Sequence, residues 1–336
     1  MPIDHRHGGI DVHAHVVPLD FPARLASSLT DAWPGVQRGC GCHATVFMGA
    51  SKYREIDDRS WDGARRQADM DMLGLRMQAL SPMPELLSYW LPKEDGAYLC
   101  RFLNEQIAAL VAQRPERFAG LGAVPLQHVD TAIGELHHAV STLGLHGVEV
   151  GSNIDGVSIG HERFRPFFEA AQALGAAVFV HPLRPAGKER LLGPPILEQI
   201  LAFPSEIGLA GAAMITGGTL AAYPRLRLCL SHGGGTLVSV LPRLQQAWKI
   251  LEPVRKHIAD SPTELARRMY YDLCVFDADL ARDLVRSFGD DRLVLGTDYP
   301  YPLREEDPVA FASTITTDVD ARERLLWRNA ERFLGL

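Results

Sequence analysis

Two histidines lie two residues apart in a short apolar run near the N-terminus, Ile-Asp-Val-His-Ala-His at residues 10–15. Alternate residues of a β-strand point to the same side, so a strand here would project His13 and His15 together. Two neutral imidazoles on one face supply half of the ligands of a transition-metal site. Short patterns of this kind also arise by chance in tags and loops, and His5 and His7 precede this one, so the interpretation depends on further ligands elsewhere.

Three later apolar runs also end in residues that can bind a metal or carry a proton. His181 ends the run at 177–181, His232 ends the run at 226–232, and Asp298 ends the run at 292–298. Enzymes built on a β/α barrel place their chemistry at the carboxyl ends of the strands. A single histidine at a strand end is more often a hydrogen-bonded structural residue. Five such residues at the ends of predicted strands favour a metal site.

The elements that must position these residues are apolar strands alternating with amphipathic helices. The sequence predicts strands at 10–15, 77–80, 119–124, 147–150, 177–181, 226–232, 269–273 and 292–298. Helices are predicted between them, at 62–73, 95–113, 131–143, 163–174, 196–203, 205–216, 237–251 and 278–288, and then from about 308 and 318. This alternation predicts a parallel sheet covered by helices, and eight strands favour a closed (β/α)8 TIM-type barrel. The first run is not followed by Gly-x-Gly-x-x-Gly, which weakens the dinucleotide-binding alternative.

The length of 336 residues fits a single barrel domain spanning 1–336. Residues of about 20–62 are predicted to form an inserted, cap-like segment that is mostly irregular, with short β-like pieces such as 44–48. A connection of this length inside a compact domain is usually functional. Asp62 is a plausible N-cap for the helix that follows the insertion.

Composition excludes several classes of function. The chain is 46% hydrophobic and 22% charged, with a net charge of -7 and no basic run, which argues against nucleic-acid binding. We find no apolar run of about 18 residues and no signal-peptide pattern, so we expect neither a membrane span nor export. Five scattered cysteines then indicate free thiols in a reducing cytoplasm. Cys40, Cys42 and His43 lack the second pair of a zinc site and are interpreted as a loop.

The segments that carry the strand-end residues resemble the amidohydrolase superfamily. Within it they are similar to the branch that contains 2-amino-3-carboxymuconate 6-semialdehyde decarboxylase and related aromatic-acid decarboxylases. The matching segments run nearly end to end: 11–15, 54–62, 178–182, 214–218, His-Gly-Gly-Gly at 232–235 and Gly-Thr-Asp-Tyr-Pro at 296–300.

The resemblance implies one divalent metal ion, usually zinc, with manganese as the alternative. It assigns His13, His15, His181 and Asp298 as metal ligands. It places His232 beside the metal as a proton carrier, and Asp298 is a second catalytic candidate. Many hydrolases of the superfamily hold two metals bridged by a lysine carbamate at the fourth strand. Here that strand has no lysine but carries Glu149, which favours one metal and leaves a carboxylate bridge as the minor alternative.

Arginines are the candidates for substrate binding, because a guanidinium binds a carboxylate through two parallel hydrogen bonds. Arg54 in the insertion and Arg243 after the glycines match substrate-binding arginines of the family, and the second of these reaches across a dimer interface in the family. We therefore expect a homodimer. The muconate-semialdehyde decarboxylases have a sequence similar to His-Pro-Trp-Asp at the position where this chain has His-Pro-Leu-Arg, residues 181–184. Arg184 is therefore a third candidate, which could pair with an additional acidic group of the substrate.

These features predict a metal-dependent, non-oxidative decarboxylase of a small carboxylate, either a carboxylated muconate semialdehyde or a related aromatic-type acid. The alternative is a hydrolase or hydratase that uses metal-activated water on a lactone, an amide or an unsaturated acid. A third class is a catalytically silent metal-binding protein, which has no need of both His232 and Asp298.

Overall fold

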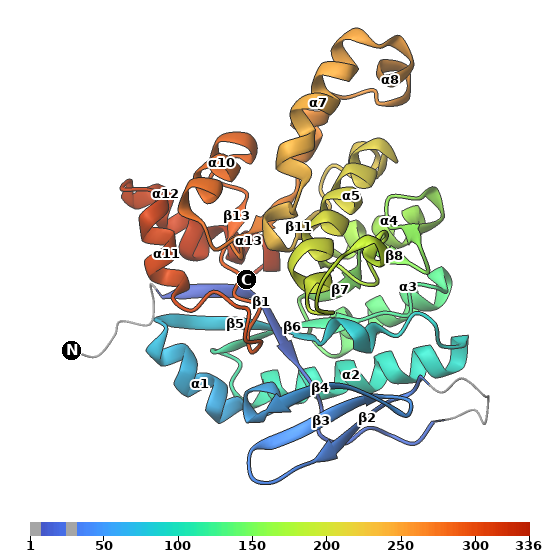
Figure 1. Cartoon of the computed structure of the whole chain (residues 1–336), viewed down its shortest axis with the longest axis vertical. Coiled ribbons are helices and arrows are strands. Elements are labelled where there is room, and N and C mark those ends of the chain that lie inside the picture. Colours follow the sequence, from blue (N-terminus) through green and yellow to red (C-terminus); the bar gives the residue numbers. More distant parts are fainter. Residues whose placement is uncertain (1–7, 25–31) are drawn as a thin grey trace.

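The computed structural model describes residues 8–24 and 32–336 and is built around eight parallel strands (Figure 1). In sheet order these are β1 (Gly9–Val16), β5 (Leu75–Pro82), β6 (Phe118–Ala123), β7 (Gly147–Gly151), β10 (Ala177–His181), β11 (Arg227–Leu230), β12 (Tyr270–Asp272) and β13 (Leu293–Val294). Bridges of Asp11 with Leu295 and of Ala14 with Tyr299 join β1 to the segment of β13. The His15 N–H donates to the Tyr299 carbonyl at 2.7 Å. The predicted (β/α)8 TIM-type barrel is therefore confirmed.

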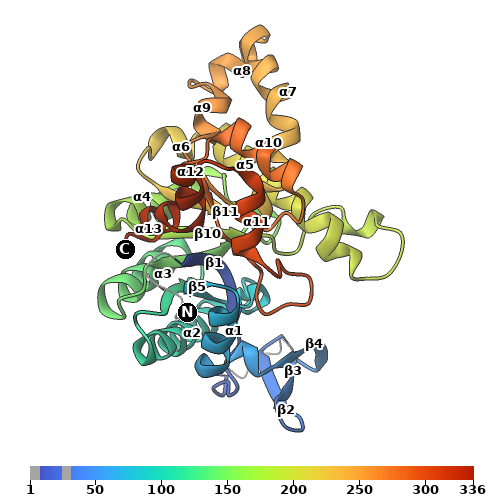
Figure 2. The same cartoon turned by 90° about the vertical axis from the view of Figure 1, so that its left-hand side faces the viewer.

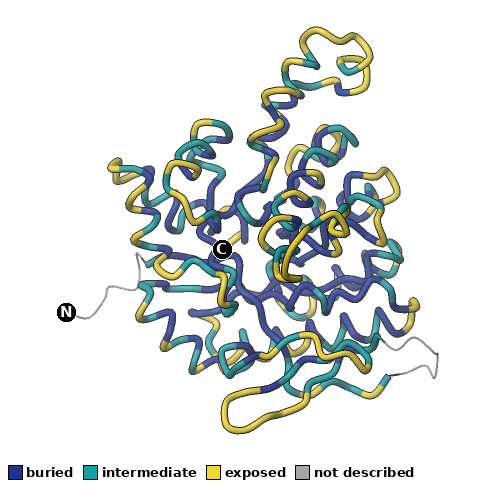
Figure 3. The backbone as a smooth tube through the Cα atoms, viewed as in Figure 1, coloured by how far each residue is buried: buried dark blue, intermediate teal, exposed yellow. Residues whose placement is uncertain are grey.

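The strands account for the apolar runs in the sequence. All eight residues of β1 are buried, which is why its polar members stand out among apolar neighbours (Figure 3). β11 stops at Leu230, two residues short of the predicted end, because His232 and Gly233 turn into the left-handed region with φ of 51° and 62°. β13 is also shorter than predicted, and the chain beyond it pairs with β1 through isolated bridges.

Helices surround the barrel much as the sequence predicts. The barrel helices that match predicted ones are α1 (Gly63–Met72), α2 (Lys93–Gln113), α3 (Val129–His137), α4 (Arg165–Leu174), α5 (Phe203–Thr216), α7 (Leu237–Ile250), α10 (Ala278–Phe288), α11 (Pro308–Ile315) and α12 (Val319–Glu323). Shorter helices are α6 (Thr219–Ala222), α8 (Glu252–His257), α9 (Pro262–Ala266) and α13 (Asn329–Leu334). Asp62 caps α1 by accepting from the N–H groups of Ala64 and Arg65, as predicted.

The inserted segment is more regular than its sequence predicted. β2 (Pro34–Arg38), β3 (His43–Met48) and β4 (Ser51–Asp57) form an antiparallel sheet at one end of the molecule (Figures 1 and 2). Only the β-like piece at 44–48 was foreseen, because β2 is short and begins with Pro-Gly, and β4 is mostly exposed and polar. Ala44 and Val46 of β3 are buried and fasten the sheet to the body. Residues 25–31 of the segment lie outside the described residues.

One helix meets the length and composition of a membrane span, contrary to the expectation from the sequence. It runs from Glu198 to Thr216, has a mean hydropathy of 1.2, and is 44% buried inside the protein. Its C-terminal part, α5, packs on α7, and a Cβ at Gly211 would lie 2.7 Å from Leu230 of β11. This contact accounts for the buried apolar residues of the helix, whereas Ile200, Leu201 and Leu209 are exposed.

Candidate metal centre

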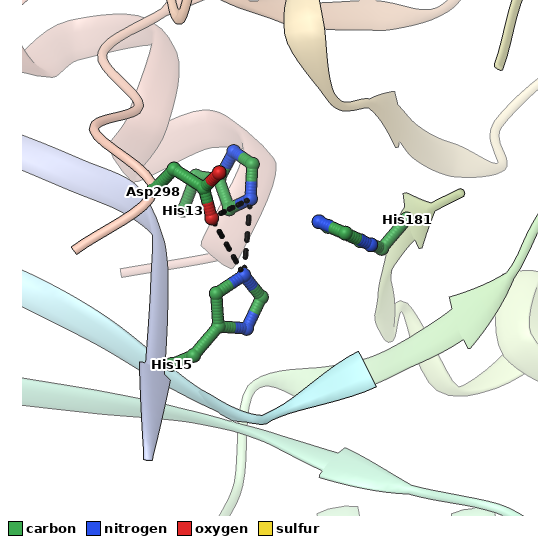
Figure 4. A group of neighbouring side chains, drawn as sticks. All are labelled: His13, His15, His181 and Asp298. Atoms are coloured by element: carbon green, nitrogen blue, oxygen red, sulfur yellow. Dashed lines mark hydrogen bonds and ion pairs between the residues drawn. The ribbon is translucent and has the colours of Figure 1, made fainter. Parts of the chain in front are cut away.

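Three elements bring four potential ligands to one point inside the barrel. β1 carries His13 and His15 on the same side, β10 ends in His181, and Asp298 follows β13 (Figure 4). One ligand atom from each residue lies within 4.8 Å of the other three. The Nε2 atoms of His13 and His15 are 3.1 Å apart, and Asp298 Oδ1 lies 3.3 and 3.2 Å from them.

The protonation states of His15, His181 and Asp298 suit a bound cation. Burial opposes ionisation of His13, but Asp298 and Asp272 raise its pKa well above the usual range, so His13 must release a proton to bind a metal. Burial lowers the pKa of His15 to about 4 and that of His181 well below its usual range, so both imidazoles are neutral at pH 7. Burial opposes ionisation of Asp298, but the neighbouring His13 and His15 hold its pKa well below the usual range. His181 Nε2 is buried without a hydrogen-bond partner among the described residues. Three imidazole nitrogens and one carboxylate oxygen fit a divalent transition metal.

The other ring nitrogen of each histidine faces an acceptor. Nδ1 of His15 lies 3.0 Å from the Pro82 carbonyl, and Nδ1 of His181 lies 2.9 Å from the Pro182 carbonyl. Nδ1 of His13 lies 2.6 Å from Asp272 Oδ2. An acceptor at Nδ1 keeps the proton there, so the Nε2 lone pair is free to bind a metal.

Asp272 was not identified from the sequence. It is fully buried at the end of β12, and it also accepts hydrogen bonds from the backbone N–H groups of Gly233 and Cys274. The sequence held a weaker signal, because Asp272 is the one charged residue inside the apolar run at 269–276.

His232 lies beside the four ligands. Its ring centroid is 5.2 Å from that of His13 and 5.3 Å from that of His181. Its Nε2 is buried without a hydrogen-bond partner among residues 8–24 and 32–336. Burial, and then the charge of His13, lower the pKa of His232, so it is a neutral base with a free nitrogen. A group with these properties can accept a proton and return it.

The family model described as amidohydrolase matches residues 10–336. This chain belongs to the amidohydrolase family.

Its amidohydrolase relatives include several named decarboxylases. The 2-amino-3-carboxymuconate-6-semialdehyde decarboxylase of Dictyostelium discoideum is 33% identical, over 97% of this chain and 91% of the relative. The crystal structure of 5-carboxyvanillate decarboxylase from Sphingomonas paucimobilis is 26% identical, covers 83% of this chain and 85% of its own, and has a TM-score of 0.76. The apo structure of Metarhizium anisopliae IDCase superimposes with a TM-score of 0.82 at 19% identity, covering 98% and 97% of the two chains, and supports the fold.

Glu149, considered as a bridge between two metals, lies behind a ligand in this amidohydrolase. Its Oε2 is 3.5 Å from His15 Nδ1, on the side of the ring away from Nε2. It is fully buried on β7, and burial raises its pKa to about 8. Glu149 is not part of the group whose ligand atoms lie within 4.8 Å.

Arg54 lies near the metal centre, in contact with an aromatic ring that stacks on one of the ligands. β4 holds the Arg54 guanidinium 4.1 Å from the ring centroid of Tyr301, and Tyr301 stacks on His15 with centroids 5.3 Å apart. Burial opposes the rise, but the neighbouring Tyr301 and Glu85, and to a smaller extent Asp298, raise the pKa of Arg54.

The other two predicted arginines lie differently. Arg184 is exposed, adopts a left-handed φ of 46°, and lies 3.8 Å from the ring centroid of Trp90. Arg243 is exposed on α7, the helix that projects from the body together with α8 (Figures 1 and 2). Cys40 and Cys42 are exposed free thiols next to β3, away from the four ligands.

Proposed function

We propose that this amidohydrolase is a metal-dependent, non-oxidative decarboxylase. Its substrate is a carboxylated muconate semialdehyde or a related aromatic-type acid. The observation that carries the proposal is the convergence of four metal ligands with His232, a half-buried base whose Nε2 is buried and has no hydrogen-bond partner in the described part of the chain. The decarboxylase names of relatives that match most of the chain support it.

The reaction breaks the bond between the carboxylate carbon and the adjoining carbon of the substrate. Carbon dioxide leaves, and the electron pair left on carbon must receive a proton. His13, His15, His181 and Asp298 would hold a divalent metal ion, which when bound would supply a Lewis acid able to polarise a substrate oxygen. His232 holds Nε2 free to take up a proton and to deliver it to that carbon. Asp298 is the second proton carrier beside the same atoms.

Zinc is our choice of metal, with manganese as the alternative. Three imidazoles and one carboxylate suit zinc, whereas the structure of a dihydroxybenzoic acid decarboxylase from Polaromonas, 23% identical to this chain, is described with bound manganese. Metal analysis of protein purified without added metal distinguishes the two.

Arginines recognise the substrate in this proposal. Arg54, above the ring that stacks on His15, binds a carboxylate, and Arg184 beside Trp90 pairs with an additional acidic group. Arg243 reaches the site of a second copy of the chain, so the active unit is a homodimer. In support, α5 and α7 pack on each other and leave Leu209 and Val240 61% and 45% exposed, as an interface between copies requires. The free thiols support a cytoplasmic location.

The test combines metal analysis with an assay for released carbon dioxide. Carboxylated muconate semialdehydes and hydroxybenzoates are the substrates. We expect one metal ion per chain and carbon dioxide release that stops after chelation and returns with metal. One metal without carbon dioxide from any acid would contradict the proposal and direct the assay to lactones, amides and unsaturated acids. A folded protein that binds no metal would contradict the site itself.

A further inference from the structure

Asp272 contacts two parts of the centre through its two carboxylate oxygens. Oδ2 lies 2.6 Å from Nδ1 of His13. Oδ1 accepts from the N–H of Gly233 at 2.9 Å and from the N–H of Cys274 at 3.2 Å. The side chain is 0% exposed, so these contacts are made away from solvent. The carboxylate therefore joins a metal ligand to the residue that follows His232.

The contact with His13 determines which ring nitrogen carries the proton. A carboxylate at Nδ1 only accepts hydrogen bonds, so it holds a proton on Nδ1 and leaves the Nε2 lone pair toward His15 and Asp298. Groups that orient a ligand in this way change metal affinity without touching the metal.

The contact with Gly233 holds an uncommon backbone conformation. His232 has φ of 51°, in the left-handed region that residues with a Cβ rarely adopt, and Gly233 follows with φ of 62°. Such a conformation persists when its surroundings fix it, and Asp272 Oδ1 supplies one of the fixing hydrogen bonds. Gly296 leaves room for the carboxylate, since a Cβ there would lie 2.7 Å from Asp272 Cβ.

We propose that Asp272 is a positioning residue that controls metal affinity through His13 and the placement of His232 through the Gly233 N–H. The two roles belong to different oxygens, so different substitutions separate them.

Asp272→Asn tests the role toward His13. Its amide oxygen still accepts from Gly233 and Cys274, but its NH₂ group then faces His13 Nδ1. Two donors cannot satisfy each other, so His13 moves its proton to Nε2 or turns away. We expect the Kd for zinc, measured by competition with a chelator, to rise about 10- to 100-fold. The visible spectrum of the cobalt-loaded protein should shift, while kcat at saturating metal stays within a few-fold of the parent protein.

Asp272→Ala removes both contacts. We expect a similar loss of zinc affinity and, in addition, a kcat at saturating metal about 10-fold or more below that of Asp272→Asn, with a changed pH profile, because His232 loses its fixed position. Glu135→Gln is the matched control, since Glu135 is a buried carboxylate on α3 that pairs with Arg101 and Asn104. It should lower the melting temperature without changing zinc affinity or the cobalt spectrum.

Zinc affinity and a cobalt spectrum unchanged in Asp272→Asn would overturn the role toward His13. Equal kcat for the two Asp272 variants at saturating metal would overturn the role toward His232. The kcat comparison rests on the proposed decarboxylase activity, but the metal measurements do not. If the parent protein binds zinc and decarboxylates no acid, the proposed function fails, and the Asp272 proposal is then judged on the metal measurements.

Discussion

At the scale of single residues, His232 differs from the four ligands by its position. Its ring lies about as far from His13 as from His181, and its Nε2 has no hydrogen-bond partner among the described residues. In the proposed reaction, a nitrogen at this position transfers a proton and is not required to hold the metal.

Replacing His232 therefore separates catalysis from metal binding. We expect His232→Asn to lower kcat by about 10²- to 10⁴-fold, the usual contribution of a positioned acid or base, while metal content stays at the parent value. His137→Asn, at an exposed position on α3, is the control and should change neither quantity. Loss of metal from the His232 variant would show that this residue is itself a ligand.

Glu149 gives the metal-free protein a specific pH dependence. Burial raises its pKa in the folded chain to about 8, against an ordinary value of 4.5. Between these pH values the folded state binds a proton that the unfolded state lacks, so the free energy of unfolding falls as pH rises. The maximum slope is about 1.4 kcal/mol per pH unit.

Glu149→Gln imitates the protonated side chain and removes this loss. The melting temperature of the variant minus that of the parent, both free of metal, should be small near pH 5 and should become increasingly positive toward pH 8.5. Glu105→Gln, on the exposed face of α2, should show no such trend. A constant difference for Glu149→Gln across this range would mean that the carboxyl group is already charged at pH 5.

At the scale of elements, the barrel strands were predictable and the inserted sheet was not. A strand buried on both faces is a continuous apolar run, so a His or Asp at its end is conspicuous, as His181 shows. Asp272 is less conspicuous, because apolar residues follow it as well as precede it. Its partner His13 is 259 residues away, and only the fold shows that they meet. β4 is mostly exposed and polar, so its sequence lacks the apolar pattern that would predict a strand.

β4 matters because it positions Arg54 over Tyr301. Arg54→Lys keeps the charge but loses the planar fork that binds a carboxylate and stacks on the ring. We expect KM to rise about 10-fold or more, with a smaller change in kcat, when carbon dioxide release is followed against substrate concentration. Arg38→Lys, on β2 of the same sheet and paired with Asp20 at the surface, should leave KM unchanged. An unchanged KM in Arg54→Lys would place the substrate carboxylate elsewhere.

At the scale of the whole molecule, the barrel unites residues from both ends of the chain. His13 and Asp298 are separated by most of the sequence. They come together because the β-bridge between Ala14 and Tyr299, the residues that follow them, joins β1 to the last segment of the barrel. Arg243 is different, because it is exposed on the projecting helix α7 while the three histidine ligands are buried. The sequence alone could place Arg243 on a helix but could not show which copy of the chain it serves.

Subunit complementation tests whether Arg243 serves a second copy. Arg243→Ala and His232→Asn are each expected to be inactive, and the two are unfolded or dissociated together and reassembled in equal amounts. If Arg243 acts across a dimer interface, each mixed dimer has one site with an intact His232 and an intact Arg243 from its partner. Random pairing makes half of the dimers mixed, so activity should recover to about a quarter of the parent value.

The same mixture gives a different result if Arg243 acts within its own chain. Every site in a mixed dimer then lacks one of the two side chains, and activity stays at the mean of the two parent variants. Mixing His232→Asn with Asp298→Ala is the control, because both changes fall in one buried centre and no pairing restores a complete site. Recovery only in the first mixture would make the dimer the catalytic unit, because a residue exposed in one chain would then complete the buried centre of another.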